Sequence, residues 1–185
     1  KGKSMSQMVA GKECVMGVDV SRWQGNINWS AFDKDFAIIK ATGGDGGLYV
    51  DGMFATNMRN CTKPRGAYHF ASLAAYGAVQ EADYFCNVLL NSEWANLPAS
   101  HKLPPVLDWE PTRAVANSGQ WVLAFLKQVE KRTAMSTVIY TGAYVALDRV
   151  LELLNYDLWL AAYTQSPPLC APWGKNWSIW QYTSS

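Results

Sequence analysis

The chain has 185 residues, of which 16 are basic and 15 are acidic, so its net charge is close to zero. That length suits one domain with a sizeable core and is short for a full eight-fold α/β barrel. The chain has no basic run of the kind that binds nucleic acid, and no apolar stretch reaches the roughly 18 residues that span a bilayer. We therefore expect one domain that binds neither nucleic acid nor a membrane.

Aromatic residues are abundant, with nine Trp and nine Tyr. Their flat apolar rings with polar edges suit the C–H faces of sugars, although most of them are expected to fill the core. The four cysteines have no C-x-x-C spacing and only two histidines accompany them, so the sequence predicts no metal site and no cofactor. The spacing is compatible with two disulfides and equally with buried thiols.

Residues 1–13 are polar, lack periodicity and contain no apolar segment of a signal peptide. We expect a flexible leader or an expression remnant there, with the domain itself spanning residues 14–185. The first strand is expected at residues 14–21, an apolar run that includes Asp19 near its end. An acid at the end of a buried strand suggests a site, while a turn-forming or helix-capping Asp is the alternative.

Strands and helices are then expected to alternate. A short helix around residues 29–34 precedes the strand 36–42, which ends at a glycine-rich loop. The loop lacks the Lys-Ser/Thr ending of a P-loop, so a flexible connection is predicted rather than a phosphate site. Helical spacing over 51–62 leads to the strand 67–71, and apolar residues at three- and four-residue intervals predict a long helix over 78–94.

Two acids, Asp108 and Glu110, lie at the end of the strand predicted over residues 103–111. Alternate side chains of an extended strand share a face, so both should point the same way, with stems roughly 6–7 Å apart. Burial and mutual repulsion favour one protonated and one ionised carboxyl group. A glycosidase needs such a pair; the alternative is a chance Asp-x-Glu on a surface strand or helix cap.

The last part of the chain changes pattern. An amphipathic helix near residues 118–132, the strand 137–142 and a helix around 143–154 repeat the unit, whereas the runs 158–163 and 177–182 are separated by a proline-rich loop. Bare strands are therefore expected at the end. Five strand–helix units followed by bare strands predict an α/β fold with a mostly parallel sheet closed into an irregular, TIM-like barrel.

Short motifs follow one another in a specific order, at residues 17–21, 23–25, 39–42, 66–70, 107–110, 139–141, 158–161 and 180–183. In this order they resemble the lysozymes of glycoside hydrolase family 25, the Chalaropsis-type muramidases of phage endolysins, bacteria and fungi. The resemblance covers the chain almost end to end. It implies a barrel of five strand–helix units and three further strands that cleaves the β-1,4 bond between N-acetylmuramic acid and N-acetylglucosamine in peptidoglycan.

The resemblance also implies roles for individual residues. Glu110 matches the general acid, Asp108 the residue that holds or polarises the attacking group, and Asp19 a third acid of the same pocket. The residues implied to contact the sugar are Tyr68, Tyr140, Tyr163 and Gln181, of which one or two would only pack the barrel under the alternative interpretation. The implied partner is bacterial cell-wall peptidoglycan. It would be attacked by a monomer that is either secreted or made in the host cytoplasm by a phage and then released.

Two departures from the family pattern affect these expectations. Family members commonly carry Glu where this chain has Gly43, and Asp45 is a candidate replacement. The family usually ends with a further strand bearing an Asp, which implies that an eighth strand and one acid lie beyond Ser185 or are missing. The alternative functions are a wall-binding module without turnover and a chitinase-like glycosidase.

Overall fold

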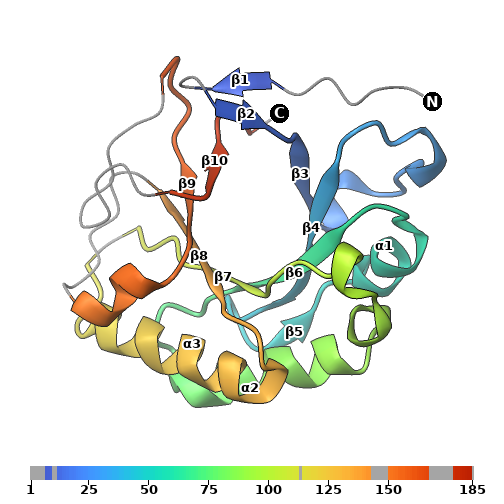
Figure 1. The fold of residues 1–185 in the computed structure, drawn as a ribbon. Helices are drawn as coiled ribbons and strands as arrows, with labels where there is room; N and C mark the ends of the chain where they lie inside the picture. Colours follow the sequence, from blue (N-terminus) through green and yellow to red (C-terminus); the bar gives the residue numbers. More distant parts are fainter. Residues whose placement is uncertain (1–6, 10–11, 113, 143–149, 167–176, 185) are drawn as a thin grey trace.

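The computed structural model describes residues 7–9, 12–112, 114–142, 150–166 and 177–184. Its centre is a curled sheet of seven parallel strands in the order β10-β9-β8-β7-β6-β4-β3, with the short strand β5 (Tyr49–Val50) antiparallel to β4. Figure 1 shows the strands forming a ring with the helices outside it. The seven strands are β3 (Gly17–Val20), β4 (Phe36–Gly43), β6 (Arg65–Phe70), β7 (Val106–Asp108), β8 (Val138–Gly142), β9 (Leu158–Ala161) and β10 (Ile179–Gln181).

The central strands are buried on both faces, as parallel strands covered by crossover helices usually are. In β4, Ala37, Ile39 and Ala41 belong to the larger core cluster, whereas Ile38 belongs to a smaller cluster with Val106. This alternation follows from the two-residue period of a strand. One face of the sheet therefore packs against the helices, and the other lines the inside of the ring.

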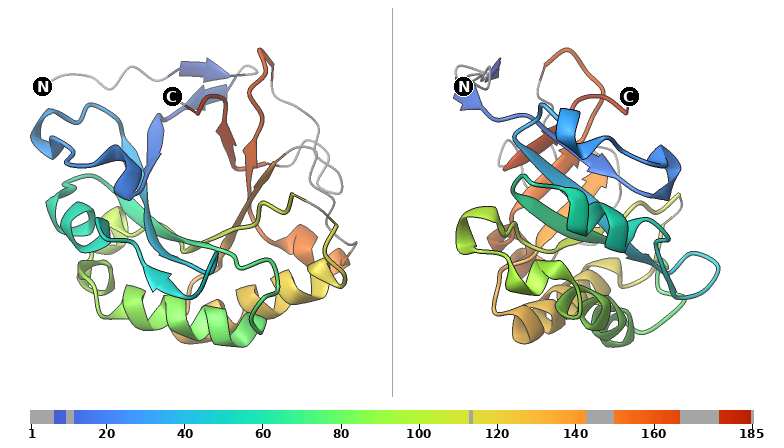
Figure 2. Two further views of the ribbon diagram at one scale, coloured as in Figure 1. Left: turned by 180° about the vertical axis from the view of Figure 1, so that it is seen from behind. Right: turned by 90° about the vertical axis from the view of Figure 1, so that its right-hand side faces the viewer.

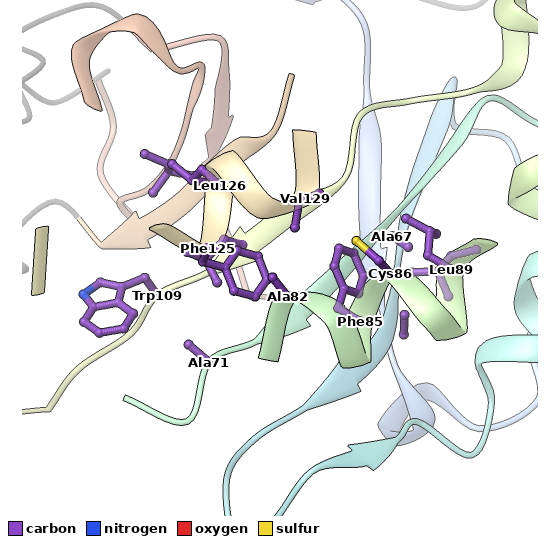
Figure 3. Close-up of a cluster of buried hydrophobic side chains, with 14 of the residues drawn as sticks. Ala67, Ala71, Ala82, Phe85, Cys86, Leu89, Trp109, Phe125, Leu126 and Val129 are labelled. Atoms are coloured by element: carbon purple, nitrogen blue, oxygen red, sulfur yellow. The ribbon is translucent and has the colours of Figure 1, made fainter. Parts of the chain in front are cut away.

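Three α-helices, α1 (Phe54–Asn60), α2 (Ala78–Leu90) and α3 (Ser118–Thr133), cover the outer face of the sheet. Helices α2 and α3 lie side by side in both views of Figure 2. Phe85 of α2 and Phe125 of α3 are fully buried, with ring centroids 6.3 Å apart. Figure 3 shows small side chains around them, Ala67 of β6, Ala71 just after β6 and Ala82 of α2, which leave room for the two rings.

Several connections are 3₁₀ turns where longer helices were predicted. The helix expected around residues 29–34 is the short turn η2 (Trp29–Ala31), and the predicted helix 78–94 ends at Leu90, with a separate turn η3 (Glu93–Asn96) after it. Part of the helix expected around 143–154 lies outside the described residues, and the remainder forms η5 (Leu151–Asn155). None of the described helices is both long and apolar enough to cross a membrane.

The predicted closed barrel is confirmed only as a curled sheet. Within the described residues the hydrogen-bonded path ends at β3 on one side and at β10 on the other. These end strands face each other across the ring in Figure 1, and a side-chain hydrogen bond from Gln181 to Asp19 joins them. The open ends are consistent with the strand count, because seven parallel strands are one fewer than a full eight-stranded barrel.

The N-terminal segment contains an ordered ribbon that the sequence did not predict. Strands β1 (Gln7–Val9) and β2 (Lys12–Cys14) pair antiparallel, and β3 begins shortly afterwards at Gly17. A two-stranded ribbon of three-residue strands has too few residues for a clear alternating pattern. Its pairing therefore leaves little signal in the sequence.

A buried polar network ties α2 to the ends of two central strands. His69 of β6 contacts Thr42 of β4 through Nδ1 at 2.8 Å and Glu81 of α2 through Nε2 at 2.7 Å. Glu81 also accepts hydrogen bonds from the backbone N–H and the hydroxyl group of Ser72. Burial lowers the pKa of His69, and the hydrogen bond to Glu81 opposes that effect. The network fixes the carboxyl ends of β4 and β6, where the candidate site lies.

Gly66 gives a test of the packing between β6 and the segment that leads into β7. A Cβ atom added there would lie 2.9 Å from the backbone oxygen of Pro104 and 3.1 Å from Cβ of Leu103. Because backbone cannot swing aside as a flexible side chain can, we expect Gly66→Ala to lower the free energy of unfolding by about 1–3 kcal/mol. Chemical denaturation measures the change.

The matched control for this substitution is Gly52→Ala. Gly52 is exposed, and a Cβ atom added there would have no neighbour within 4 Å. The free energy of unfolding of the Gly52→Ala variant should differ from that of the parent by no more than about 0.5–1 kcal/mol. Equal stability of the two variants would contradict the close packing at Gly66.

Candidate active site

The three predicted acids lie together at the carboxyl ends of the parallel strands, the edge at which barrel enzymes place their chemistry. Asp19 lies in β3, and Asp108 is the last residue of β7. Glu110 was expected in the same strand as Asp108, but β7 ends before it, so the side chain reaches the site from the loop after β7. The two carboxyl groups are nevertheless close enough to hydrogen-bond.

Asp108 lies on the inner face of the sheet and is only 7% exposed. Burial raises its pKa well above the usual range for Asp, and the charge and hydrogen bond of Glu110 raise it further. The nearby ammonium group of Lys40 acts in the opposite direction. Among the described residues, Oδ1 of Asp108 has no hydrogen-bond partner. Asp108 therefore tends to hold a proton before substrate binds.

Glu110 is exposed, and it lines the wall of a large cavity rather than the outside of the molecule. The cavity has a volume of about 1820 Å³ and runs along the inside of the ring, with Asp19, Tyr140, Trp159 and Gln181 also on its wall. A volume of this size exceeds the usual few hundred to one thousand Å³ of small-molecule pockets. Glu110 can thus meet a large ligand directly, with Asp108 buried beside it.

Gln181 of β10 connects three of the predicted site residues. Its side-chain oxygen accepts hydrogen bonds from the hydroxyl groups of Tyr140 at 2.9 Å and Tyr163 at 3.0 Å. Its side-chain nitrogen donates to Oδ2 of Asp19 at 2.7 Å. Burial raises the pKa of Asp19, and the hydrogen bond from Gln181 partly offsets that rise. The amide thus orients two tyrosines and supports the ionised form of an acid.

Replacing Gln181 with Leu tests this arrangement. The substitution removes the donor to Asp19 and the acceptor shared by Tyr140 and Tyr163. The pKa of Asp19 should therefore rise further, and kcat/KM should fall by at least about tenfold, the loss expected from the hydrogen bond to the charged group alone. The pH dependence of kcat/KM measures both effects, with the acid limb moving to higher pH. Gln128→Leu is the matched control, because Gln128 also donates to an Asp, Asp83 at 2.7 Å, between α3 and α2. Equal activity of the two variants would contradict the role of Gln181.

The predicted site residues Tyr68 and Tyr163 differ in burial. Tyr68 of β6 is half-buried, and its pKa is raised by burial and by the acids around it, Asp108 first among them. Tyr163 is 59% exposed and follows β9. Tyr68 therefore presents a neutral phenol beside the acids, whereas Tyr163 offers its ring at the rim.

Lys40 is a site residue that the sequence analysis missed. It lies in β4, is 9% exposed, and its ammonium group is 4.6 Å from the centre of the Phe70 ring and 5.9 Å from that of Tyr68. The register between β4 and β6 shifts just after Lys40, a bulge of the kind often found near active sites. The sequence did contain a signal for this residue. A lysine within an apolar strand indicates a function or a partner, because lysine is rarely buried unless it is paired.

Gly43, the first departure from the family pattern, lies against Tyr49. A Cβ atom added to Gly43 would be 2.5 Å from the phenol end of Tyr49. The Tyr49 hydroxyl group donates to Oδ1 of Asp45 at 2.8 Å. Tyr49 thus fills the space that a larger residue at position 43 would need, and Asp45 holds Tyr49 in place.

The cysteines differ in their surroundings, and Cys14 lines the same cavity as Asp19 and Glu110. Cys61 and Cys86 are buried, and burial raises the pKa of both thiols. Cys170 lies outside the described residues. Within the described part of the chain, no group of three or more His, Cys, Asp or Glu is placed to hold a metal ion.

Comparison with known proteins shows the family of the chain. The model of the family named Glycosyl hydrolases family 25 matches residues 18–185. The chain belongs to glycosyl hydrolase family 25. Family 25 membership places it among the glycoside hydrolases, as the ordered motifs predicted.

Individual family 25 relatives cover most of the chain. Lysozyme M1 of Streptomyces globisporus is 32% identical over 194 residues, which is 92% of this chain, and the chain spans 62% of the length of that relative. A crystal structure of the bacterial lysozyme from Streptomyces coelicolor has a TM-score of 0.77 and 33% identity, and the match covers 91% of this chain and 83% of that one. A muramidase from Trichobolus zukalii has a TM-score of 0.74 and 27% identity, with 91% and 87% of the two chains covered.

Proposed function

We propose that this family 25 chain is a peptidoglycan hydrolase of the lysozyme type, which cleaves the β-1,4 bond between N-acetylmuramic acid and N-acetylglucosamine. The observation that carries the proposal is the pair of carboxyl groups, one buried and one exposed, beside a cavity of about 1820 Å³. Relatives described as lysozymes and as a muramidase support the choice of substrate.

The chemistry depends on where the pair holds its proton. Before substrate binds, the proton lies on Asp108, because burial and the charge of Glu110 raise the pKa of that group. A sugar bound over Glu110 removes water from that carboxylate and favours its protonated form. The hydrogen bond between the two groups gives the proton a direct path from Asp108 to Glu110. Substrate binding thus prepares Glu110 as the acid.

Proton transfer also gives Asp108 its second role. Glu110 donates the proton to the leaving glycosidic oxygen, while Asp108, now ionised, can hold the N–H of the substrate's acetamido group. That contact would aim the acetamido oxygen at the anomeric carbon. Lys40 stabilises the ionised form of Asp108, since its positive charge lowers the pKa of that group.

The remaining site residues position the sugar. Asp19, supported by Gln181, supplies a further negative charge facing the cavity, which favours the positive charge that develops on the sugar in the transition state. Tyr68, Tyr140 and Tyr163 offer rings and hydroxyl groups to the glycan. Such groups suit sugars, which combine C–H faces with many hydroxyl groups.

The identity of the products tests this function. Purified peptidoglycan is incubated with the protein, the products are reduced with borohydride, and mass spectrometry identifies the new reducing ends. We expect reduced N-acetylmuramic acid at every new end. Reduced N-acetylglucosamine would assign the other glycosidic bond, and wall binding without new reducing ends would indicate a binding module. Chitin oligomers in parallel test the chitinase-like alternative.

A further inference from the structure

A continuous series of alternating rings and cations leads from the acids to the surface. The ammonium group of Lys40 lies 5.9 Å from the centre of the Tyr68 ring and 5.5 Å from that of Tyr49. The guanidinium carbon of Arg22 is also 5.5 Å from the centre of the Tyr49 ring, and it is 5.0 Å from that of Trp23. Every contact is within the roughly 6 Å at which cation–π attraction acts.

The outer end of this series is held in place by its backbone. The N–H of Arg22 donates to Oδ2 of Asp51, a residue only 2% exposed, at 3.1 Å. Ser21 and Gln24 form a reciprocal capping box around Arg22 and Trp23. The indole ring of Trp23 is 78% exposed, although its backbone is fixed and Arg22 stacks on it. The indole ring of Trp23 therefore presents a flat apolar face to solvent from a fixed backbone.

Arg22 has the free donors that an anion would need. Among the described residues, no carboxylate lies within ion-pair distance of its guanidinium group, in contrast to Arg59 and Arg132, which are both paired. The planar guanidinium group can bind a carboxylate through two parallel N–H donors. Its contacts with two rings restrict the orientation of the group, so less freedom is lost when it binds.

The position of this group agrees with an extension of the catalytic groove. Gln24, next to Trp23, lines the same cavity as Asp19 and Glu110. Tyr68 is close to Asp108, Asp19 and Glu110 and also contacts Lys40. A glycan lying over Glu110 could therefore place a neighbouring sugar near Trp23 and Arg22.

We propose that Arg22, Trp23 and Tyr49 form an outer subsite for a sugar that carries a carboxylate. Trp23 stacks on the ring face of the sugar, Arg22 binds the carboxylate through two donors, and Tyr49 orients Arg22. This inference rests on the proposed function and deepens it by naming the group that distinguishes the substrate from a neutral chitin chain. The carboxylate belongs either to the lactyl ether of muramic acid or to its stem peptide.

The test compares kinetics on four soluble glycan preparations. One carries stem peptides, and in a second an amidase has removed them and left free lactyl carboxylates. The other two are the same preparations after their carboxylates have been converted to neutral amides. We expect Arg22→Gln to raise KM about tenfold on a preparation with free carboxylates, with a smaller effect on kcat, and to match the parent on the amides. Trp23→Ala should raise KM on all four.

Arg59→Gln is the matched control, since Arg59 is an exposed arginine paired with Glu93 at 3.1 Å, away from the acids. The preparation on which Arg22→Gln differs from Arg59→Gln identifies the source of the carboxylate. Equal KM values for these two variants on both charged preparations would overturn the subsite. An equal rise on the amides would overturn carboxylate recognition.

The measurements distinguish a failure of the subsite from a failure of the proposed function. If the parent releases no reducing ends, calorimetric binding of the charged and amidated glycans to the parent and to Arg22→Gln still measures the subsite. If the parent is active and Arg22→Gln behaves like the control, only the subsite is overturned.

Discussion

Replacing Glu110 with Gln is expected to lower kcat/KM on peptidoglycan by about 10²–10⁴-fold, the usual contribution of a general acid. The amide keeps the shape of the side chain but cannot give up a proton to the leaving oxygen. Because Glu110 is exposed before substrate binds, the substitution should leave the unfolding midpoint within a few degrees of the parent. Release of reducing sugars and thermal unfolding measure the two effects.

Glu152→Gln provides the control for this substitution. Glu152 is also an exposed glutamate, and its contact with Lys127 at 3.9 Å is a surface ion pair of little energetic weight. Its variant should hydrolyse peptidoglycan at the parent rate. If Glu110→Gln also retained the parent rate, the assignment of Glu110 as the acid would be wrong.

Replacing Asp108 with Asn should have the second large effect, because it removes the partner with which Glu110 shares a proton. In the parent, the last proton of the pair leaves at a raised pKa, since burial and the first negative charge both oppose a second charge. In the Asp108→Asn variant that proton is lost, because an amide does not titrate and Glu110 no longer has a neighbour from which to receive it. At neutral pH we therefore expect activity to fall by at least about 10²-fold.

The pH profile separates this explanation from simple damage to the site. In the parent, the raised pKa of Asp108 keeps a proton on the pair to higher pH, so the alkaline limb of kcat/KM should move to lower pH when Asp108 is replaced by Asn. The variant should therefore recover part of its activity in acid relative to the parent. A uniform loss at every pH, with the limb unmoved, would show that Asp108 does not govern the protonation of Glu110. Asp83→Asn, at a surface carboxylate whose pKa is lowered by Gln128 and Arg132, should leave the profile unchanged.

The parallel α/β units were predictable because they have strong periodic signals. The run that became β4 is apolar on both faces, and Phe85 and Phe125 lie on helix faces with three- and four-residue spacing. The short 3₁₀ turns have no comparable signal, since one turn gives no period to detect. Closure of the ring is not confirmed among the described residues, because sequence pattern identifies strands but does not say whether the first and last of them pair.

The candidate site was predictable where motifs placed acids at strand ends. Asp19, Asp108 and Glu110 do meet, although Glu110 comes from a loop, because β7 ends at Asp108 and no pattern in so short a strand marks its end. Gln181 was predicted to contact sugar, and its link to Asp19, a residue 162 positions away, was not predicted. Such a contact depends on how far the whole sheet curls. The sequence predicted that one acid of the pair would be protonated and the other ionised, and only the structure identifies Asp108 as the buried one.

The seam between β3 and β10 has a consequence for how the molecule responds to heat. Within the part of the chain that the structure describes, each end strand is hydrogen-bonded to a strand on one side only, and β10 contributes three residues. Edge segments of this kind open at a lower free energy than the interior of a sheet. Asp19 lies in β3 and Gln181 in β10. A transient separation of these two strands would therefore break the contact between Asp19 and Gln181 while the helices and central strands stay packed. Thermal inactivation should therefore begin below the temperature at which the rest of the protein melts.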